Sequence, residues 1–256
     1  MLEEFINEEF DIIIQAGQSN SEGCGQGETS SPFVPNEKIL YMYGDFSISI
    51  AEEHKWDKEP IGNFSLSFAT EYLANDKLQD GRKLLVLRTA VGGTGFCDKR
   101  WGIGNDLFIR MMEMTKAVLA LNKKNKLVAL LWHQGETDAG GFRDVHYKNL
   151  TTLVNTVRST FNFPCLPFVA GDFVNEWKTA NLAACEPIIA AIKDTCTDIG
   201  NARFVETSEL LSNNQQIGNG DTIHFSKEAL DILGRKYFVA FCEITAGDAL
   251  PNICVK

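Results

Sequence analysis

The stretch F-D-I-I-I-Q-A-G-Q-S-N, residues 10–20, decides the fold. Residues 10–16 are almost continuously apolar and have the length of one strand, a pattern typical of a strand buried on both faces of a parallel sheet. Gly17 follows at once and permits a sharp turn, because glycine adopts backbone angles that other residues avoid. Ser19 therefore lies just beyond the carboxyl end of the strand, at the edge of the predicted sheet.

Further apolar runs of strand length alternate with segments of helical periodicity along the chain. The runs are residues 84–90, 127–132, 166–170 and 202–205, and the helical segments are residues 66–79, 106–121, 145–160, 185–198 and 227–241. This alternation predicts an α/β fold, a parallel sheet covered by helices. Residues 21–64 break the alternation with Gly, Pro, Ser and acidic residues and one strand-like piece at 39–43, as functional or irregular excursions do.

Length and charge limit the classes of protein that fit. The 256 residues, 44% of them hydrophobic, are enough for one substantial core, so we expect a single domain over residues 1–256. The formal net charge of -10 argues against nucleic acid and against an anionic membrane surface as partners, because both need a basic face. The sequence leaves open whether the chain forms a homo-oligomer.

The cysteines and the N-terminus favour a cytoplasmic location. The cysteines are odd in number and form no C-x-x-C pair, so we interpret all of them as free thiols and exclude a cysteine-based redox or metal site; they are Cys24, Cys97, Cys165, Cys185, Cys196, Cys242 and Cys254. The first ten residues are acidic and lack the basic start of a secretory signal, and no apolar run reaches membrane-spanning length.

Several polar residues follow the ends of predicted strands, where ligands bind in parallel α/β sheets. Gly92 and Gly93 come just after the run 84–90, and Gln134 follows the run 127–132 in the segment W-H-Q-G-E-T-D, residues 132–138. The glycines fit either an ordinary tight turn or a turn whose N–H groups face a ligand. Gln134 fits either a buried amide that ties two loops together or a donor to a developing negative charge.

Only one of the four histidines has a nearby acid in a turn. His54 and His146 lie in polar surroundings and are predicted to be solvated, and His133 follows a buried strand, as a packed core histidine would. His224 stands three residues after Asp221 in a Gly- and Asn-rich loop before the last helix. The carboxylate can reach Nδ1–H of the imidazole and fix its tautomer, although an Asp that caps the last helix beside a bystander His gives the same pattern.

Together these segments contain the groups that acyl transfer requires: a hydroxyl, backbone N–H donors, an amide, and a carboxylate beside an imidazole. Taken alone, Ser19 also fits an N-cap of the following helix. G-Q-S-N-S is not the G-x-S-x-G elbow of α/β-hydrolases. The acids Glu136 and Asp138 resemble the carboxylate pair of a glycosidase, but that interpretation leaves Ser19 and His224 without a role.

The sequence resembles the SGNH/GDSL hydrolases, and within them the sialate O-acetylesterase-like group that includes the carbohydrate esterase family six acetylxylan esterases. Four segments carry the resemblance, in the family's order and across nearly the whole chain: G-Q-S-N (17–20), A-V-G-G-T (90–94), W-H-Q-G-E-T-D (132–138) and D-T-I-H-F (221–225). The combination of W-H-Q-G-E-T-D with G-Q-S-N is highly specific to this group.

The resemblance implies a fold, an activity and a role for each residue. The fold would be a three-layer α/β/α sandwich around a flavodoxin-like, five-stranded parallel sheet, with no metal and no cofactor. Ser19 would be the nucleophile, His224 the general base and then acid, and Asp221 its orienting partner. The oxyanion hole would consist of Ser19 N–H, Gly93 N–H and the Gln134 side chain, with Gly92 left open as the alternative donor and Glu136 as a supporting group.

The implied substrate is an O-acetylated carbohydrate, of the xylo-oligosaccharide or the sialic acid type. Four aromatic residues fit either sugar stacking or the core, namely Phe96, Trp101, Phe142 and Trp177. The alternative is a non-catalytic carbohydrate-binding protein on the same fold, which would have lost at least one member of the Ser-His-Asp set. Flavin binding is suggested by the fold type alone and carries little weight.

Overall fold

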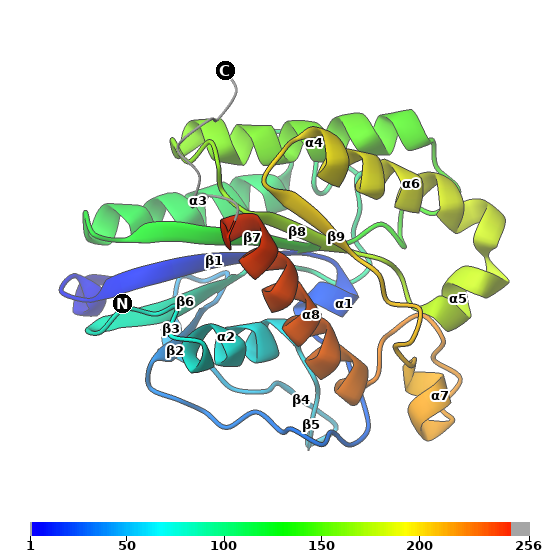
Figure 1. The fold of residues 1–256 in the computed structure, drawn as a ribbon, viewed down its shortest axis with the longest axis horizontal. Coiled ribbons are helices and arrows are strands. Elements are labelled where there is room, and N and C mark those ends of the chain that lie inside the picture. The colour runs from blue at the N-terminus through cyan, green and yellow to red at the C-terminus, as the bar shows by residue number, and fades with distance from the viewer. Residues whose placement is uncertain (1, 247–256) are drawn as a thin grey trace.

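A seven-stranded sheet forms the centre of the molecule in the computed structural model, which describes residues 2–246 (Figure 1). In sheet order the strands are β3 (Ile48–Ile50), β2 (Ile39–Met42), β6 (Arg82–Arg88), β1 (Glu9–Gly17), β7 (Lys126–His133), β8 (Phe168–Gly171) and β9 (Ala202–Val205). All neighbours pair in parallel except β3, which is antiparallel to β2 at the edge. The predicted α/β class with a parallel sheet is therefore confirmed.

The sheet is wider than the five strands expected. The five predicted strands, β1, β6, β7, β8 and β9, are adjacent in the order 2-1-3-4-5, which is the flavodoxin-like arrangement. The strand-like piece at residues 39–43 adds β2 to the edge of β6, with Ile39 opposite Leu84 and Met42 opposite Leu87. The count of five was too low because β2 and β3 are short, lie inside an irregular segment, and form strands by pairing with each other and, for β2, with β6.

Helices cover both faces of the sheet and complete three layers (Figure 1). One face carries α3 (Asp106–Leu121), α4 (Arg143–Thr160) and α6 (Leu182–Asp198), and the other carries α2 (Phe64–Ala74) and α8 (Lys227–Ala246). Smaller elements fill the connections: η1 (Leu2–Phe5), α1 (Ser19–Glu22), α5 (Asn175–Ala180), α7 (Asn213–Ile217) and a hairpin of β4 (Lys55–Trp56) and β5 (Glu59–Pro60).

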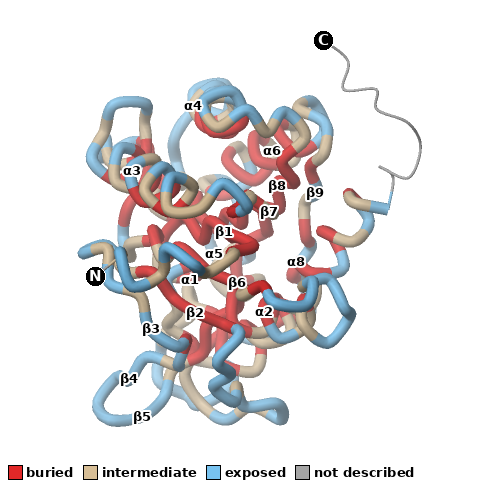
Figure 2. The backbone as a smooth tube through the Cα atoms, turned by 90° about the vertical axis from the view of Figure 1, so that its left-hand side faces the viewer, coloured by how far each residue is buried: buried red, intermediate tan, exposed pale blue. Residues whose placement is uncertain are grey.

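Strand β1 supplies both halves of the core, as its sequence predicts. Ile12 and Ile14 belong to the cluster under α3, α4 and α6, whereas Ile13 belongs to the cluster under α2 and α8. Successive side chains of a strand point to opposite faces, so an uninterrupted apolar run serves both layers. In Figure 2 the central strands β2, β6, β1, β7 and β8 are mostly coloured as buried, whereas the β4–β5 hairpin is coloured as exposed.

The cysteine prediction needs one correction. Five thiols are free, those of Cys24, Cys97, Cys185, Cys196 and Cys242, whereas Cys165 is disulfide-bonded and Cys254 lies outside the described residues. The parity argument from the sequence fails here because an odd number of cysteines does not prevent one pair from forming. Over residues 2–246, no helix is both long and apolar enough to cross a membrane.

Candidate active site

Gly17 sets the geometry of the turn that presents Ser19. Strand β1 ends at Gly17, whose φ of 126° is unfavourable for residues with a side chain, and α1 begins two residues later. A Cβ at Gly17 would lie 2.1 Å from the carbonyl oxygen of His133, so the strand end packs directly against β7. The N–H of Gln18 donates to that same carbonyl at 2.9 Å. Ser19 is thereby fixed at the carboxyl edge of the sheet, at the first position of α1.

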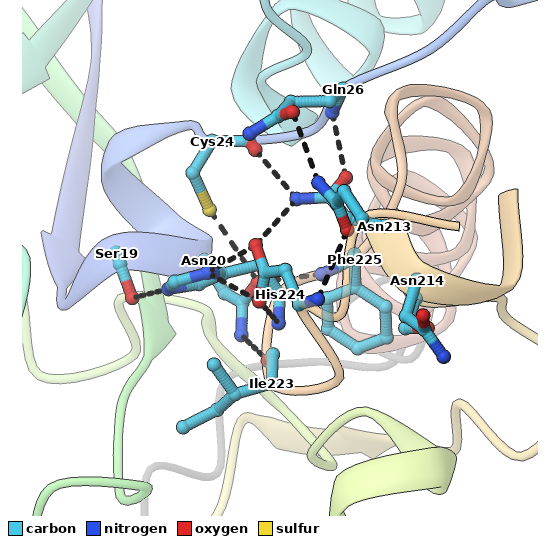
Figure 3. A network of polar contacts seen from close by, with 12 residues as sticks. Ser19, Asn20, Cys24, Gln26, Asn213, Asn214, Ile223, His224 and Phe225 are labelled. Carbon is cyan, nitrogen blue, oxygen red and sulfur yellow. Dashed lines mark hydrogen bonds and ion pairs between the residues drawn. The ribbon is translucent and has the colours of Figure 1, made fainter. Parts of the chain in front are cut away.

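Ser19, His224 and Asp221 form a continuous hydrogen-bonded row, two members of which are labelled in Figure 3. Nε2 of His224 lies 2.9 Å from Oγ of Ser19, and Nδ1 lies 2.9 Å from Oδ2 of Asp221. Burial raises the pKa of Asp221, but hydrogen bonds from Asn213 and His224 outweigh it and hold this pKa below its ordinary value. Asp221 is therefore a carboxylate at neutral pH and favours the Nδ1–H tautomer of His224.

Asn20 joins the three segments of the site that are far apart in the sequence (Figure 3). Its fully buried side chain donates from Nδ2 to Glu136 at 2.8 Å and to the carbonyl of Ile223 at 3.1 Å. Its Oδ1 accepts from the N–H of Phe225 at 3.0 Å. One amide thus ties the Ser19 turn to the loop that carries His224 and to the loop after β7.

Asn213, at the start of α7, orients the carboxylate of Asp221. It is fully buried, and its Nδ2 donates to Oδ2 of Asp221 at 2.9 Å and to the carbonyl of Cys24 at 3.1 Å. Its Oδ1 accepts from the N–H of Gln26 at 2.7 Å (Figure 3). The sequence gives no signal for this role, since nothing local to Asn213 distinguishes it from its neighbour Asn214.

Glu136 and His133 form a buried pair behind Asn20. Oε1 of Glu136 lies 3.7 Å from Nε2 of His133, beyond hydrogen-bond distance. Burial raises the pKa of Glu136 and lowers that of His133 to about 3, so the histidine is neutral at pH 7. The hydroxyl of Tyr237 donates to the carbonyl of Trp132 and thus accepts from Nδ1 of His133 at 3.0 Å. His133 is a packed core histidine, as predicted.

The turn at Gly92 and Gly93 lies beside Ser19, and its two N–H groups differ in availability. A Cβ at Gly92 would lie 3.5 Å from Cβ of Ser19. The N–H of Gly92 donates to Oε2 of Glu22 at 2.6 Å, whereas the N–H of Gly93 makes no hydrogen bond with any residue from 2 to 246. Of the two donors that the sequence left open, Gly93 is the one with a free hydrogen.

Gln134 is completely buried next to the Ser19 turn. Its Nε2 donates to Oδ2 of Asp138 at 3.0 Å and makes a long contact of 3.4 Å to Oε1 of Gln18. Asp138 also accepts from the N–H groups of Phe96 and Cys97. Burial raises the pKa of Asp138, but these hydrogen bonds and the nearby His146 outweigh burial. The pKa of this carboxyl is therefore well below its ordinary value, and Asp138 is ionised at neutral pH.

His146 is not solvated, which corrects the prediction from its polar helix. The residue is 2% exposed, and its Nδ1 lies 3.2 Å from Oδ2 of Asp138. The ring packs edge-on against Phe96 at 5.2 Å between centroids. The polar sequence around His146 belongs to the outer face of α4, whereas His146 itself points inward. His54 is exposed, as predicted.

A cavity of about 470 Å³ opens directly over Ser19 and His224. Its wall includes Trp56, which is 65% exposed on the β4–β5 hairpin, together with Arg88 at the end of β6. The aromatics proposed from the sequence do not line it: Phe96 and Trp101 are buried in the core, Trp177 packs against Phe173, and Phe142 is exposed elsewhere. Arg88 was not among the site residues predicted from the sequence. The sequence does contain a signal for it, because a charged residue at the end of an apolar strand is unusual.

We searched the described residues for clusters of side chains that could bind a metal ion. Over residues 2–246, no group of three or more His, Cys, Asp and Glu side chains is arranged so that it could hold a metal ion.

Comparison with known proteins identifies the family of the chain. Residues 9–243 match the family model described as carbohydrate esterase, sialic acid-specific acetylesterase. No curated protein matches the chain significantly.

Solved structures share the fold at low sequence identity. NanS has a TM-score of 0.76 at 17% identity, over 94% of this chain and 98% of its own. A protein from Arabidopsis thaliana has a TM-score of 0.71 at 21% identity, over 91% of this chain and 98% of its own. A carbohydrate acetylesterase from Xanthomonas citri has a TM-score of 0.64 at 15% identity, over 94% of this chain and 57% of its own. Because the family model spans nearly the whole sequence, this chain belongs to the carbohydrate esterase family of sialic acid-specific acetylesterases.

Proposed function

We propose that the chain is a serine esterase that removes O-acetyl groups from a carbohydrate through an acetyl-serine intermediate. The observation that carries the proposal is the row Ser19–His224–Asp221, with 2.9 Å from Oγ to Nε2 and 2.9 Å from Nδ1 to Oδ2. A nucleophile within hydrogen-bond distance of a base, with the base oriented by a third group, is the arrangement that activates a serine hydroxyl.

The reaction proceeds in two acyl transfers. Nε2 of His224 takes the proton from Oγ of Ser19 as Oγ attacks the acetyl carbonyl carbon and a tetrahedral oxyanion forms. The protonated His224 then gives this proton to the sugar oxygen as the C–O bond of the ester breaks. Water, deprotonated by His224, attacks the acetyl-serine, and the second tetrahedral species breaks down as the C–Oγ bond breaks and His224 returns the proton to Oγ, which releases acetate and restores Ser19. Asp221 stabilises the imidazolium in each step.

Three donors are proposed for the oxyanion. The N–H of Ser19 lies at the start of α1, and the N–H of Gly93 is free because Glu22 binds its neighbour Gly92 instead. The third donor is Nε2 of Gln134, which donates one hydrogen to Asp138 and makes only a long contact to Gln18 with the other. Loss of one such donor typically lowers kcat by about 10²–10³-fold.

The proposed substrate is an O-acetylated sugar of the sialic acid or xylo-oligosaccharide type. The family's name supports the sialic acid type, and Trp56 in the cavity wall offers an exposed aromatic face to a sugar ring. A non-catalytic binding protein is the weaker alternative, since the hydrogen bonds that join Ser19, His224 and Asp221 support the esterase. Five free thiols support the cytoplasmic location proposed from the sequence, while the disulfide at Cys165 opposes it.

Labelling with a fluorophosphonate, followed by mass spectrometry, tests the nucleophile. We expect one adduct, on Ser19, and a fall of at least about 10³-fold in kcat for p-nitrophenyl acetate in Ser19→Ala. The exposed Ser208 provides a matched control, because Ser208→Ala removes a hydroxyl that does not line the cavity. Near-full turnover by a folded Ser19→Ala protein would refute the assignment. No adduct and no turnover in the folded wild type would favour the binding protein.

A further inference from the structure

Two of the eight arginines lack the partners that the others have. Five form ion pairs with acids, namely Arg82, Arg100, Arg143, Arg203 and Arg235. Arg158 instead donates to four backbone carbonyls, those of Leu166, Ile199, Gly200 and Asn201. Arg88 and Arg110 remain, and neither has a carboxylate within 4.0 Å in the described part of the chain. Acidic residues outnumber basic ones in this protein, which has a net charge of -10, so two arginines without an acidic partner are unexpected.

The guanidinium of Arg88 is held rigidly but has unused donors. It lies 5.0 Å from the ring centre of Tyr41 and 5.7 Å from that of Tyr43. Its Nη2 donates to the carbonyl of Glu22 at 2.7 Å, whereas Nε is buried without a partner and Nη1 bonds to nothing that the structure describes. The cation–π contacts with the two tyrosine rings hold the guanidinium in place and leave Nη1 as a donor without a partner among the described residues.

Arg110 is the second arginine without an acidic partner. Its Nη2 donates to the carbonyl of Thr89 at 3.2 Å, and its Nε is buried without a partner. Both arginines line a cavity of about 210 Å³. This smaller cavity shares Glu22, His54 and Arg88 with the larger one over Ser19, so the two are neighbouring compartments of one site.

The other charged groups around the smaller cavity offset the two arginines only in part, with one acidic residue against two guanidinium groups. Glu22 is its only acidic lining residue, and its Oε2 is bound to the N–H of Gly92. Loss of hydration beside the cavity wall and the charge of Arg88 lower the pKa of His54, so this imidazole is neutral at pH 7. Two fixed positive charges with unsatisfied buried donors are costly unless an anion completes them.

We propose that Arg88 and Arg110 form a carboxylate subsite, so that the substrate is an acidic O-acetylated sugar whose carboxylate lies here while its ester lies at Ser19. This inference rests on the proposed esterase function. Arginine suits the role because its planar fork binds both oxygens of a carboxylate. The shared wall at Arg88 allows one molecule to occupy both compartments. Trp56 packs on the sugar ring from the hairpin above Ser19.

Acetate release from an O-acetylated sialic acid, compared with release from its carboxyl methyl ester, tests the subsite. The methyl ester keeps the sugar and the acetyl group but removes the charge. A charge-assisted contact contributes enough to make kcat/KM of the wild type about 10- to 100-fold higher for the free acid. In Arg88→Gln/Arg110→Gln we expect this ratio to fall to about threefold or less. Arg88→Lys keeps the charge without the fork, and we expect an intermediate ratio.

Controls separate this inference from the proposed function. Arg203→Gln removes an exposed arginine that pairs with Glu243 and should keep the wild-type ratio. An unchanged ratio in the double variant, or an equal fall for both substrates, would overturn the subsite. If no substrate releases acetate, the esterase proposal fails, and calorimetry then decides the subsite alone: Ser19→Ala must bind the free acid more tightly than the methyl ester, and Arg88→Gln must remove that difference.

Discussion

Asn213 holds the Asp221 carboxylate in a way that makes it a positioning residue for the proposed reaction. We predict that Asn213→Ala lowers kcat by about 10- to 100-fold with little change in KM, because a misplaced carboxylate orients the imidazole less well. The lost hydrogen bond raises the pKa of Asp221, so activity should also begin to fall at a higher pH on the acid side. Steady-state kinetics from pH 4 to pH 8 measure both effects.

The neighbouring Asn214 gives a matched control. Its Nδ2 donates to Glu176 and its Oδ1 accepts from the N–H of Gly220, but its side chain makes no bond to the Asp221 carboxylate. Asn214→Ala should therefore leave kcat and the acid side of the pH profile close to wild type. An Asn213→Ala protein that is folded and keeps the wild-type kcat would contradict the positioning role.

The junction of β1 and α1 depends on the absence of a side chain at Gly17. We predict that Gly17→Ala lowers the free energy of unfolding by about 2–4 kcal/mol, since the methyl group would meet the His133 carbonyl at 2.1 Å and φ is 126°. Urea denaturation measures the loss. Gly81→Ala is the control, because Gly81 also has a positive φ, 80°, but has no atom within 4 Å of its Cβ position. Equal losses in the two variants would mean that the close contact contributes nothing.

The stability of the whole molecule should depend on pH through its buried histidine. His133 has a pKa of about 3 when folded and about 6.5 when unfolded, so the unfolded state binds a proton first as the pH falls. The stability that neutral His133 contributes is complete above pH 6.5 and is lost as the pH falls from 6.5 towards 3. From pH 7 to pH 5.5 we expect a loss of about 1 kcal/mol from this residue.

Comparison of wild type with His133→Asn isolates that loss. Urea midpoints at pH 7 and pH 5.5 should differ less in the variant than in the wild type. His54 also has a lowered pKa, and Glu136 has a raised one that favours the folded state at lower pH, so the wild-type curve alone is not diagnostic. His54→Asn serves as the control, because it removes the other histidine that has a lowered pKa. The same pH dependence in wild type and His133→Asn would show that His133 is not the source.

The sequence by itself determined the layers of the fold and the segments that meet at the site. The run at residues 10–16 predicts a strand buried on both faces, because the apolar pattern is contained in a few consecutive residues. Gly17 predicts the turn, which is also a local feature. Asp221 and His224 are three residues apart, so their pairing needs only a local turn. The boundaries of α3 and β7 were predicted to within two residues.

Only the tertiary structure decided which of several equivalent residues are partners. Asn213 and Asn214 are alike in sequence, yet one binds Asp221 and the other binds Glu176. Gly92 and Gly93 differ because Glu22, 70 residues earlier, takes one N–H and leaves the other free. Arg88 differs from the five ion-paired arginines because, among the described residues, its guanidinium bonds to a backbone carbonyl and its Nε has no partner. Such choices depend on long-range packing, in which a few tenths of an ångström decide a hydrogen bond, and no local pattern records them.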